Sequence, residues 1–149
     1  MQKIIKTQEE MIIFGKELAS KLTGGDIVLL HGDLGAGKTT LTKGIAMGLG
    51  VEDEIVSPTF TLMQEYKTQD SRLEDYKIKR LVHIDTYRLE NEEQLREIGV
   101  EDYLGDKETV CVIEWPEKIE RLLVGRKVMN ILIEHCEGGR KIKVENQKI

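Results

Sequence analysis

The chain has 149 residues, of which 40% are hydrophobic and 33% are charged, and its formal net charge is −5. These values fit one globular domain over residues 1–149; they exclude a disordered chain and disfavour a surface built mainly to bind nucleic acid. No apolar run is long enough to span a membrane, so we expect no membrane contact. The two cysteines form no CxxC pattern, and residues 1–6 are too polar for a signal peptide, which favours a cytoplasmic protein.

The first third of the chain predicts alternating strands and helices. Thr7 followed by Glu10 resembles a capping box, so a helix is expected to begin there and to end at Gly24. The continuous apolar run Ile27–Leu30 is typical of a strand buried on both faces. The expected elements are a strand over 3–6, a helix from 7 to 24, a strand over 27–30, and a second helix that ends at residue 50.

The rest of the chain continues this alternation and ends in a hairpin. Strands are expected over 60–66, 81–84 and 110–113, helices over 92–98 and 116–123, and hairpin strands over 128–133 and 142–144. Residues 67–80 are highly charged and poor in apolar side chains, which predicts an exposed excursion. We therefore predict an α/β fold with one central, mostly parallel sheet and a C-terminal hairpin.

A glycine-rich turn separates the strand at 27–30 from the helix that follows it. The segment 32–39 reads Gly-Asp-Leu-Gly-Ala-Gly-Lys-Thr and matches the P-loop pattern in full. The glycines let successive backbone N–H groups point at phosphate oxygens, Lys38 is expected to reach the β- and γ-phosphates, and the Thr39 hydroxyl is expected to hold Mg²⁺. The alternative is a plain glycine turn. Pattern and context together predict a three-layer P-loop NTPase domain that binds ATP and Mg²⁺.

Two acidic residues follow apolar strands. Asp85 comes directly after the strand at 81–84, and Glu114 comes directly after the strand at 110–113. Strand ends in such sheets meet at the ligand crevice, where a P-loop enzyme needs a carboxylate for the magnesium shell. Either residue could instead cap a helix and face water. With a P-loop in the same sheet, we interpret both as site residues and take Lys38, Asp85 and Glu114 as the catalytic set.

Three further features have open interpretations. Ser57-Pro58-Thr59 lies where many P-loop proteins place a loop that senses the γ-phosphate, but it could equally be a simple turn before a strand. Trp115 either packs near the site or fills a gap, and the role of His83 is open.

Four motifs in this order resemble the TsaE (YjeE) family of small bacterial ATPases. They are residues 32–40, 57–62 (Ser-Pro-Thr-Phe-Thr-Leu), 83–89 (His-Ile-Asp-Thr-Tyr-Arg-Leu) and 112–116 (Val-Ile-Glu-Trp-Pro). The resemblance covers most of the chain. It implies an ATPase that works with TsaB and TsaD and supports their repeated turnover. That machinery makes N6-threonylcarbamoyladenosine beside the anticodon of tRNAs that read codons beginning with A, so tRNA is met indirectly, through the complex.

The resemblance also assigns roles by position. It makes Thr39 and Glu114 the magnesium residues, Asp85 essential for hydrolysis, and Ser57-Pro58-Thr59 a switch-like loop. It places Gln8 and Gly139 beside the adenine. The excursion at 67–80 is longer than the family's usual connection. The implied nucleotide-binding residues are Gln8, Asp33, Leu34, Gly35, Ala36, Gly37, Lys38, Thr39, Thr40, Ser57, Thr59 and Gly139.

Two other functions fit a P-loop chain of this size. A small-molecule kinase needs a lid with arginines; Arg72 and Arg80 lie in the excursion, but its charges are mixed and it has no arginine pair. A non-catalytic module would bind ATP without hydrolysing it. No arginine stands in a recognisable finger motif, so we expect slow hydrolysis that partners stimulate, with Arg88 as the best internal candidate.

Overall fold

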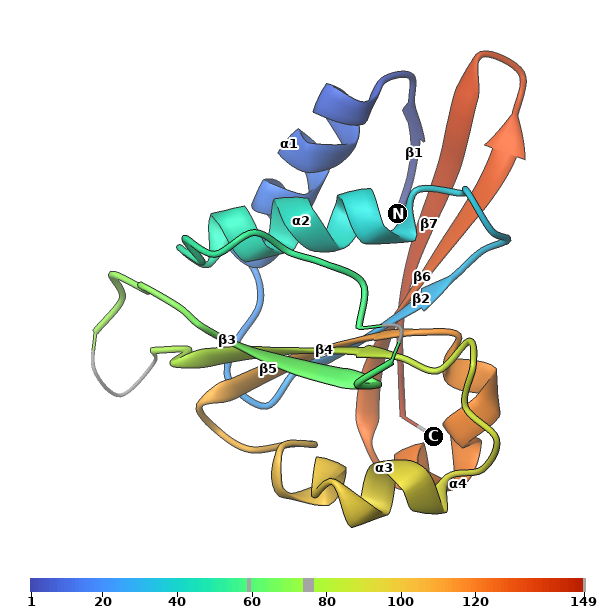
Figure 1. Cartoon of the computed structure of the whole chain (residues 1–149). Coiled ribbons are helices and arrows are strands. Elements are labelled where there is room, and N and C mark those ends of the chain that lie inside the picture. Colours follow the sequence, from blue (N-terminus) through green and yellow to red (C-terminus); the bar gives the residue numbers. More distant parts are fainter. Residues whose placement is uncertain (59, 74–76, 149) are drawn as a thin grey trace.

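One mixed sheet of seven strands organises the molecule (Figure 1). The computed structural model describes residues 1–58, 60–73 and 77–148. The strands are β1 (Gln2–Ile5), β2 (Ile27–His31), β3 (Met63–Lys67), β4 (Arg80–Asp85), β5 (Thr109–Glu114), β6 (Lys127–Cys136) and β7 (Gly139–Lys148). The helices are α1 (Gln8–Ala19), α2 (Lys38–Gly48), α3 (Glu93–Glu97) and α4 (Glu120–Leu123), with short 3-10 turns η2 (Val100–Asp102) and η3 (Pro116–Ile119).

The middle of the sheet is parallel and its edges are antiparallel. The strand order is β1-β7-β6-β2-β5-β4-β3, in which β6, β2, β5 and β4 run parallel to their neighbours in that group. The pairs β1–β7, β6–β7 and β3–β4 are antiparallel. The predicted α/β class and parallel centre are confirmed, and the C-terminal hairpin is longer than the sequence pattern indicated.

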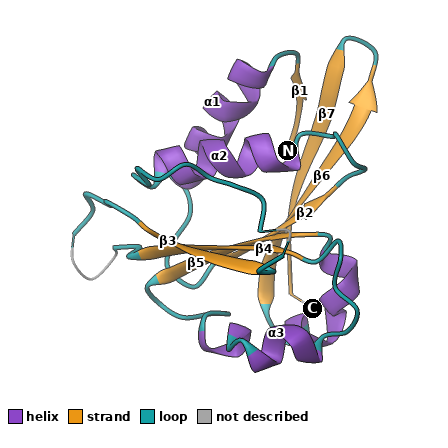
Figure 2. Cartoon of the chain, viewed as in Figure 1, coloured by secondary structure: helices purple, strands orange, loops and turns teal. Residues whose placement is uncertain are grey.

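Helices cover both faces of the sheet, which gives the predicted three layers (Figure 2). Alternate residues of β2 belong to different cores. Val28 and Leu30 pack in the cluster that includes α1 and α2, whereas Ile27 and Leu29 pack with α4 and the turns before it. A central strand must be apolar on both sides to serve two cores, and this explains the unbroken apolar run. Among the described residues, every helix is too short or too polar to traverse a bilayer.

Two helices are shorter than the sequence pattern predicted. Helix α1 ends at Ala19, before the expected Gly24, and the helix expected over 116–123 is the 3-10 turn η3 followed by α4.

Two further segments differ from the sequence expectation. The strand predicted from Phe60 begins only at β3, because Leu62 has a left-handed φ of 66° and donates its N–H to the Pro58 carbonyl in a turn. The expected exposed excursion is partly anchored to the body. Ile78 is 1% exposed, and the Asp70 carboxylate accepts hydrogen bonds from the Ile78 N–H and the Arg72 guanidinium. A buried carboxylate with these donors explains why a charged segment folds back.

The predicted capping box is formed in part at the start of α1, because Glu10 binds the N–H of Lys6 instead of that of the N-cap residue Thr7. The Thr7 hydroxyl accepts the Glu10 N–H at 3.1 Å, and the Glu10 carboxylate accepts the Lys6 N–H at 2.7 Å. The first bond satisfies a backbone donor that a helix start leaves unpaired, and the second ties the residue before the N-cap to the first turn. They fix the entry of α1 at one side of the P-loop.

Helices α1 and α2 pack closely because glycines meet where they cross. A Cβ at Gly15 would lie 2.7 Å from the Gly44 Cα, and one at Gly44 would lie 2.5 Å from the Ile12 carbonyl oxygen. Such distances are too short for a carbon atom without a shift of backbone. The crossing therefore sets how deeply α2 sits on the sheet.

We predict that Gly44→Ala destabilises the fold although alanine is the better helix former by roughly 1 kcal/mol. Overpacking the helix crossing is expected to lower the free energy of unfolding by about 1–3 kcal/mol. Urea denaturation followed by circular dichroism measures it. Lys43→Ala, at an exposed neighbouring position of α2, is the control and should leave stability nearly unchanged. A Gly44→Ala variant as stable as the original would contradict the close crossing.

Candidate functional site

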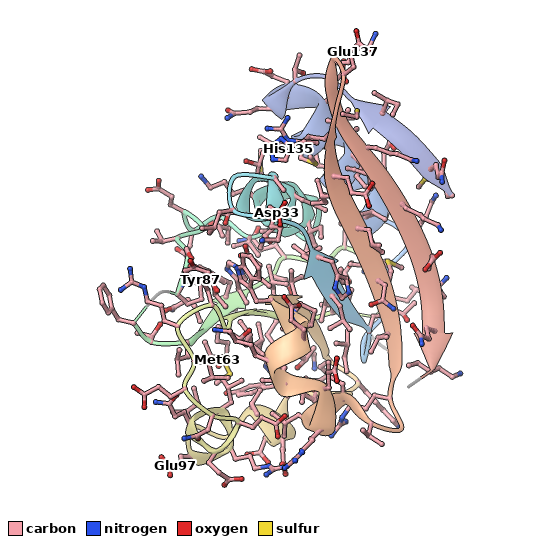
Figure 3. The ribbon with its side chains drawn as sticks, turned by 90° about the vertical axis from the view of Figure 1, so that its right-hand side faces the viewer. Asp33, Met63, Tyr87, Glu97, His135 and Glu137 are labelled. Carbon is pink, nitrogen blue, oxygen red and sulfur yellow. The ribbon has the colours of Figure 1, made fainter. Side chains whose placement is uncertain are left out.

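The P-loop connects the carboxyl end of β2 to the start of α2. Gly35 and Gly37 have φ angles of 77° and 111°, left-handed values that glycine adopts without strain. The loop lies on the edge at which β2, β4 and β5 end, and this edge faces the reader in Figure 3, where Asp33 and Tyr87 are labelled. Strand register completes the arrangement: Glu114 pairs with Leu30 on one side and with Asp85 on the other.

A cavity of about 590 Å³ opens at this edge of the sheet. Its walls come from the P-loop, the ends of β4 and β5, the start of α1 and the start of β7. Of the predicted site residues, those that line it are Gln8, Leu34, Gly35, Ala36, Gly37, Lys38, Thr39, Thr40, Ser57, Asp85, Glu114 and Gly139. Asp33 is exposed and stands outside the described lining, and Thr59 lies outside the described residues.

The Lys38 ammonium is held inside the loop. Its Nζ donates to the Gly32 carbonyl and, at 3.4 Å, to the Asp33 carbonyl, and it lies 3.6 Å from the centroid of the Trp115 ring. Burial lowers the pKa of Lys38, while the charges of Glu114 and Asp85 oppose that shift. The side chain is 5% exposed. A positive group with this little water around it is suited to neutralise phosphate oxygens.

Glu114 sits between the P-loop helix and the sheet. Its Oε1 accepts the Thr39 hydroxyl at 3.3 Å, and its Oε2 lies 2.6 Å from Nε2 of His83. The residue is 3% exposed. Thus a hydroxyl and a carboxylate converge at the mouth of the P-loop, as a hard cation requires.

These residues fit Mg²⁺ of the kind that nucleotides carry. In residues 1–58, 60–73 and 77–148, no group of three or more His, Cys, Asp or Glu side chains could form a protein-only metal cage. Mg²⁺ characteristically takes few protein oxygens and completes its shell with phosphates and water. Thr39 and Glu114 supply such a pair of oxygen donors.

Asp85 joins the predicted γ-phosphate loop to the sheet. Its Oδ2 accepts the Ser57 hydroxyl at 2.9 Å, and its Oδ1 accepts the Tyr87 N–H at 3.0 Å. The structure thus brings together two features, Ser57 and Asp85, that are 28 residues apart in the sequence.

Trp115 belongs to the cavity wall, which resolves its open interpretation. Besides its contact with Lys38, its ring packs 5.1 Å, centroid to centroid, from that of Tyr87. Its φ of 59° is left-handed, a conformation that is uncommon without glycine and that clusters at functional sites. The sequence signal was its position directly after Glu114.

The sequence did not predict the cation at the other end of the cavity. Arg140, at the start of β7, donates from Nε to the Ala36 carbonyl at 3.2 Å and from Nη2 to the Gly35 carbonyl at 3.4 Å. Its proximity depends on the pairing of β7 with β1 and β6, which no local motif encodes. The remaining lining residues to which sequence reasoning gave no role in the site are Ile5, Lys6, Thr7, Met11 and Tyr87.

Comparison with known proteins relates this chain to one family. The family model "Threonylcarbamoyl adenosine biosynthesis protein TsaE" matches residues 5–142. A protein of Nostoc sp. is 42% identical over 149 residues, covering 97% of this chain and 85% of its own. One of Treponema pallidum is 36% identical, covering 97% and 99%, and one of Haemophilus influenzae is 35% identical, covering 94% and 85%. All three are named tRNA threonylcarbamoyladenosine biosynthesis protein TsaE.

A solved structure agrees with the sequence matches. The crystal structure of YdiB from Bacillus subtilis superposes with a TM-score of 0.74 at 33% identity, covering 98% of this chain and 84% of that one. With a family model that spans nearly the whole chain, relatives above 30% identity and a shared fold, the chain belongs to the TsaE family.

Proposed function

We propose that this protein binds MgATP and hydrolyses it to support a TsaB–TsaD complex in forming N6-threonylcarbamoyladenosine next to the anticodon of tRNA. The observation that carries the proposal is the convergence of Lys38, Thr39 and Glu114 in one cavity at the P-loop. The pathway comes from the names of the family and of its relatives. The partners come from the resemblance of the four motifs.

Binding of ATP is the first step that the site supports. The P-loop backbone N–H groups would hold the phosphates, and the Lys38 ammonium, which is 5% exposed, would compensate their charge. Gln8 and Gly139 line the cavity at the end formed by α1 and β7, and we propose this end for the adenine.

Hydrolysis needs the two acidic residues in different roles. When bound, Mg²⁺ would supply positive charge against the negative charge that develops on the phosphates. Thr39 supplies a hydroxyl ligand, and Glu114 supplies the negative charge that holds the ion and its waters. Asp85 holds Ser57, and with it the loop that we propose senses the γ-phosphate.

The arrangement of arginines favours an ATPase over a small-molecule kinase. Arg72 is paired with Asp70, and Arg80 is paired with Glu65 and Asp106. In the described part of the cavity, the arginines of the wall are Arg88 and Arg140. The two arginines of the excursion are thus engaged in ion pairs instead of forming a lid.

Both arginines of the described cavity wall contact other groups, which makes partner dependence the expected behaviour. Arg140 binds P-loop carbonyls, and the Arg88 guanidinium carbon lies 5.7 Å from the centroid of the exposed Phe60 ring. We propose that a partner either supplies the transition-state donor or orders the loop that carries Phe60, so that hydrolysis is coupled to assembly.

Replacing the P-loop lysine tests nucleotide binding. We expect Lys38→Ala to weaken ATP binding by about ten- to a hundredfold, because a charge-assisted contact worth roughly 1.5–3 kcal/mol is lost. Isothermal titration calorimetry measures the affinity, with Lys43→Ala on the exposed face of α2 as the control. Equal affinities of Lys38→Ala and the original protein would remove the P-loop assignment.

Neutralising the carboxylate tests the metal role. We expect Glu114→Gln to fold normally but to lose magnesium-dependent hydrolysis, because the amide keeps the shape and lacks the negative charge. Phosphate release at varied MgCl₂ measures the effect, and Glu117→Gln, at an exposed position nearby, is the matched control. Unchanged hydrolysis by Glu114→Gln would transfer the metal role to Asp85.

Adding partners tests the coupling. We expect the isolated protein to turn over well below the typical enzyme value of about 10 s⁻¹ and to accelerate when TsaB–TsaD is present. A steady-state assay with stoichiometric partners decides the matter. Fast hydrolysis by the isolated protein, at a rate that TsaB–TsaD does not change, would contradict the coupling. Consumption of ATP that requires a small acceptor indicates a kinase, and tight binding without hydrolysis under either condition indicates a non-catalytic module.

A further inference from the structure

A completely buried histidine stands behind the Glu114 carboxylate. His83 is 0% exposed, lies on β4 two residues before Asp85, and places Nε2 2.6 Å from Oε2 of Glu114. The contact joins β4 to the end of the neighbouring strand β5. Burying a polar side chain inside the sheet costs free energy unless it is hydrogen-bonded. The contact with Glu114 supplies such a hydrogen bond, and an apolar side chain would fill the same space without needing one.

The surroundings of Nδ1, the second ring nitrogen of His83, bear on which nitrogen donates to Glu114. Nδ1 of His83 is buried and has no hydrogen-bond partner among the described residues. An ionised carboxylate only accepts hydrogen bonds, so Nε2 is the donor. Nε2 is therefore the ring nitrogen through which His83 acts on Glu114.

The backbone of Glu114 is held by hydrogen bonds to Thr86, so only the orientation of its side chain needs a further restraint. Its carbonyl accepts the Thr86 N–H at 3.2 Å and the Thr86 hydroxyl at 3.1 Å. The Thr39 hydroxyl lies 3.3 Å from Oε1 and 3.5 Å from Oε2, both long for a hydrogen bond between these groups. The short contact to His83 is therefore the one that determines where the carboxylate points.

We propose that His83 is a positioning residue for magnesium binding. Its Nε2 holds Oε2 of Glu114, so that Oε1 is the oxygen nearer to the Thr39 hydroxyl at the start of the P-loop helix. A donor on this side of the carboxylate orients it toward the place of the cation. Outer partners of this kind fix the orientation of metal-binding groups elsewhere. The inference rests on the proposed metal role of Glu114.

Three substitutions separate the hydrogen bond from the volume of the ring. In His83→Gln the amide nitrogen reaches the place of Nε2. In His83→Asn the amide is one carbon shorter and reaches only the place of Nδ1, where no partner lies among the described residues. His83→Leu fills the space without a donor. Calorimetric titration with ATP, in EDTA and over a series of MgCl₂ concentrations, gives the affinity without metal and the magnesium concentration for half-maximal effect.

We expect all three variants to bind ATP in EDTA as the original protein does, which also reports that they are folded. The Asn and Leu variants should need about ten- to a hundredfold more magnesium, the range found when such outer partners are removed. The Gln variant should need nearly the original concentration. If the Leu variant does not fold, the Gln and Asn variants decide the question, because both carry an amide and differ only in reach.

Two outcomes overturn the inference: the original magnesium requirement in the Asn and Leu variants, or the same loss in Gln as in Asn. Glu114→Gln, measured in parallel, separates this failure from that of the proposed function. If Glu114→Gln alone raises the magnesium requirement, the role of His83 is wrong and the metal role of Glu114 stands. If Glu114→Gln has no effect either, the proposed metal role itself is wrong.

Discussion

The rest of the site depends on the contacts of the Glu114 carboxylate. It connects Thr39, the second residue of the P-loop helix, with His83 inside the sheet, and so it fixes the helix start relative to two strand ends. A buried carboxylate is costly to keep in a protein unless donors satisfy it. Here the donors are groups that a magnesium site needs in any case, so one arrangement serves both the fold and the proposed chemistry.

The sheet topology explains why so few residues suffice. Parallel pairing of β4, β5 and β2 places the last residues of these strands side by side, so Asp85 and Glu114 reach the P-loop without long side chains. The antiparallel pairs at the edges add further residues to the wall of the cavity. In particular, pairing of β7 with β1 brings Arg140 and the start of α1 to the same cavity. The glycine contact between α1 and α2 keeps this wall close to the loop.

Sequence patterns were sufficient where the cause of a structure is local. The helix cap at Thr7, the apolar run of β2 and the spacing of the P-loop each depend on neighbours within a few residues, and each element formed as expected. Leu62 turns the chain by a left-handed φ that no propensity indicates, so β3 starts late. Arg140 and the Asp70 contacts depend on long-range pairing. His83 had an open role because its partner is 31 residues away in sequence.

A structure of the protein with Mg²⁺ and a non-hydrolysable ATP analogue tests the central claim most directly. The account predicts a metal ion about 2.0–2.1 Å from Thr39 Oγ1, the distance that octahedral Mg²⁺ requires, with Glu114 beside it and the β- and γ-phosphates against Lys38. It also predicts that the contact between His83 and Glu114 persists. A metal ion bound away from Thr39 and Glu114, or phosphates that lie outside the P-loop, would contradict the account.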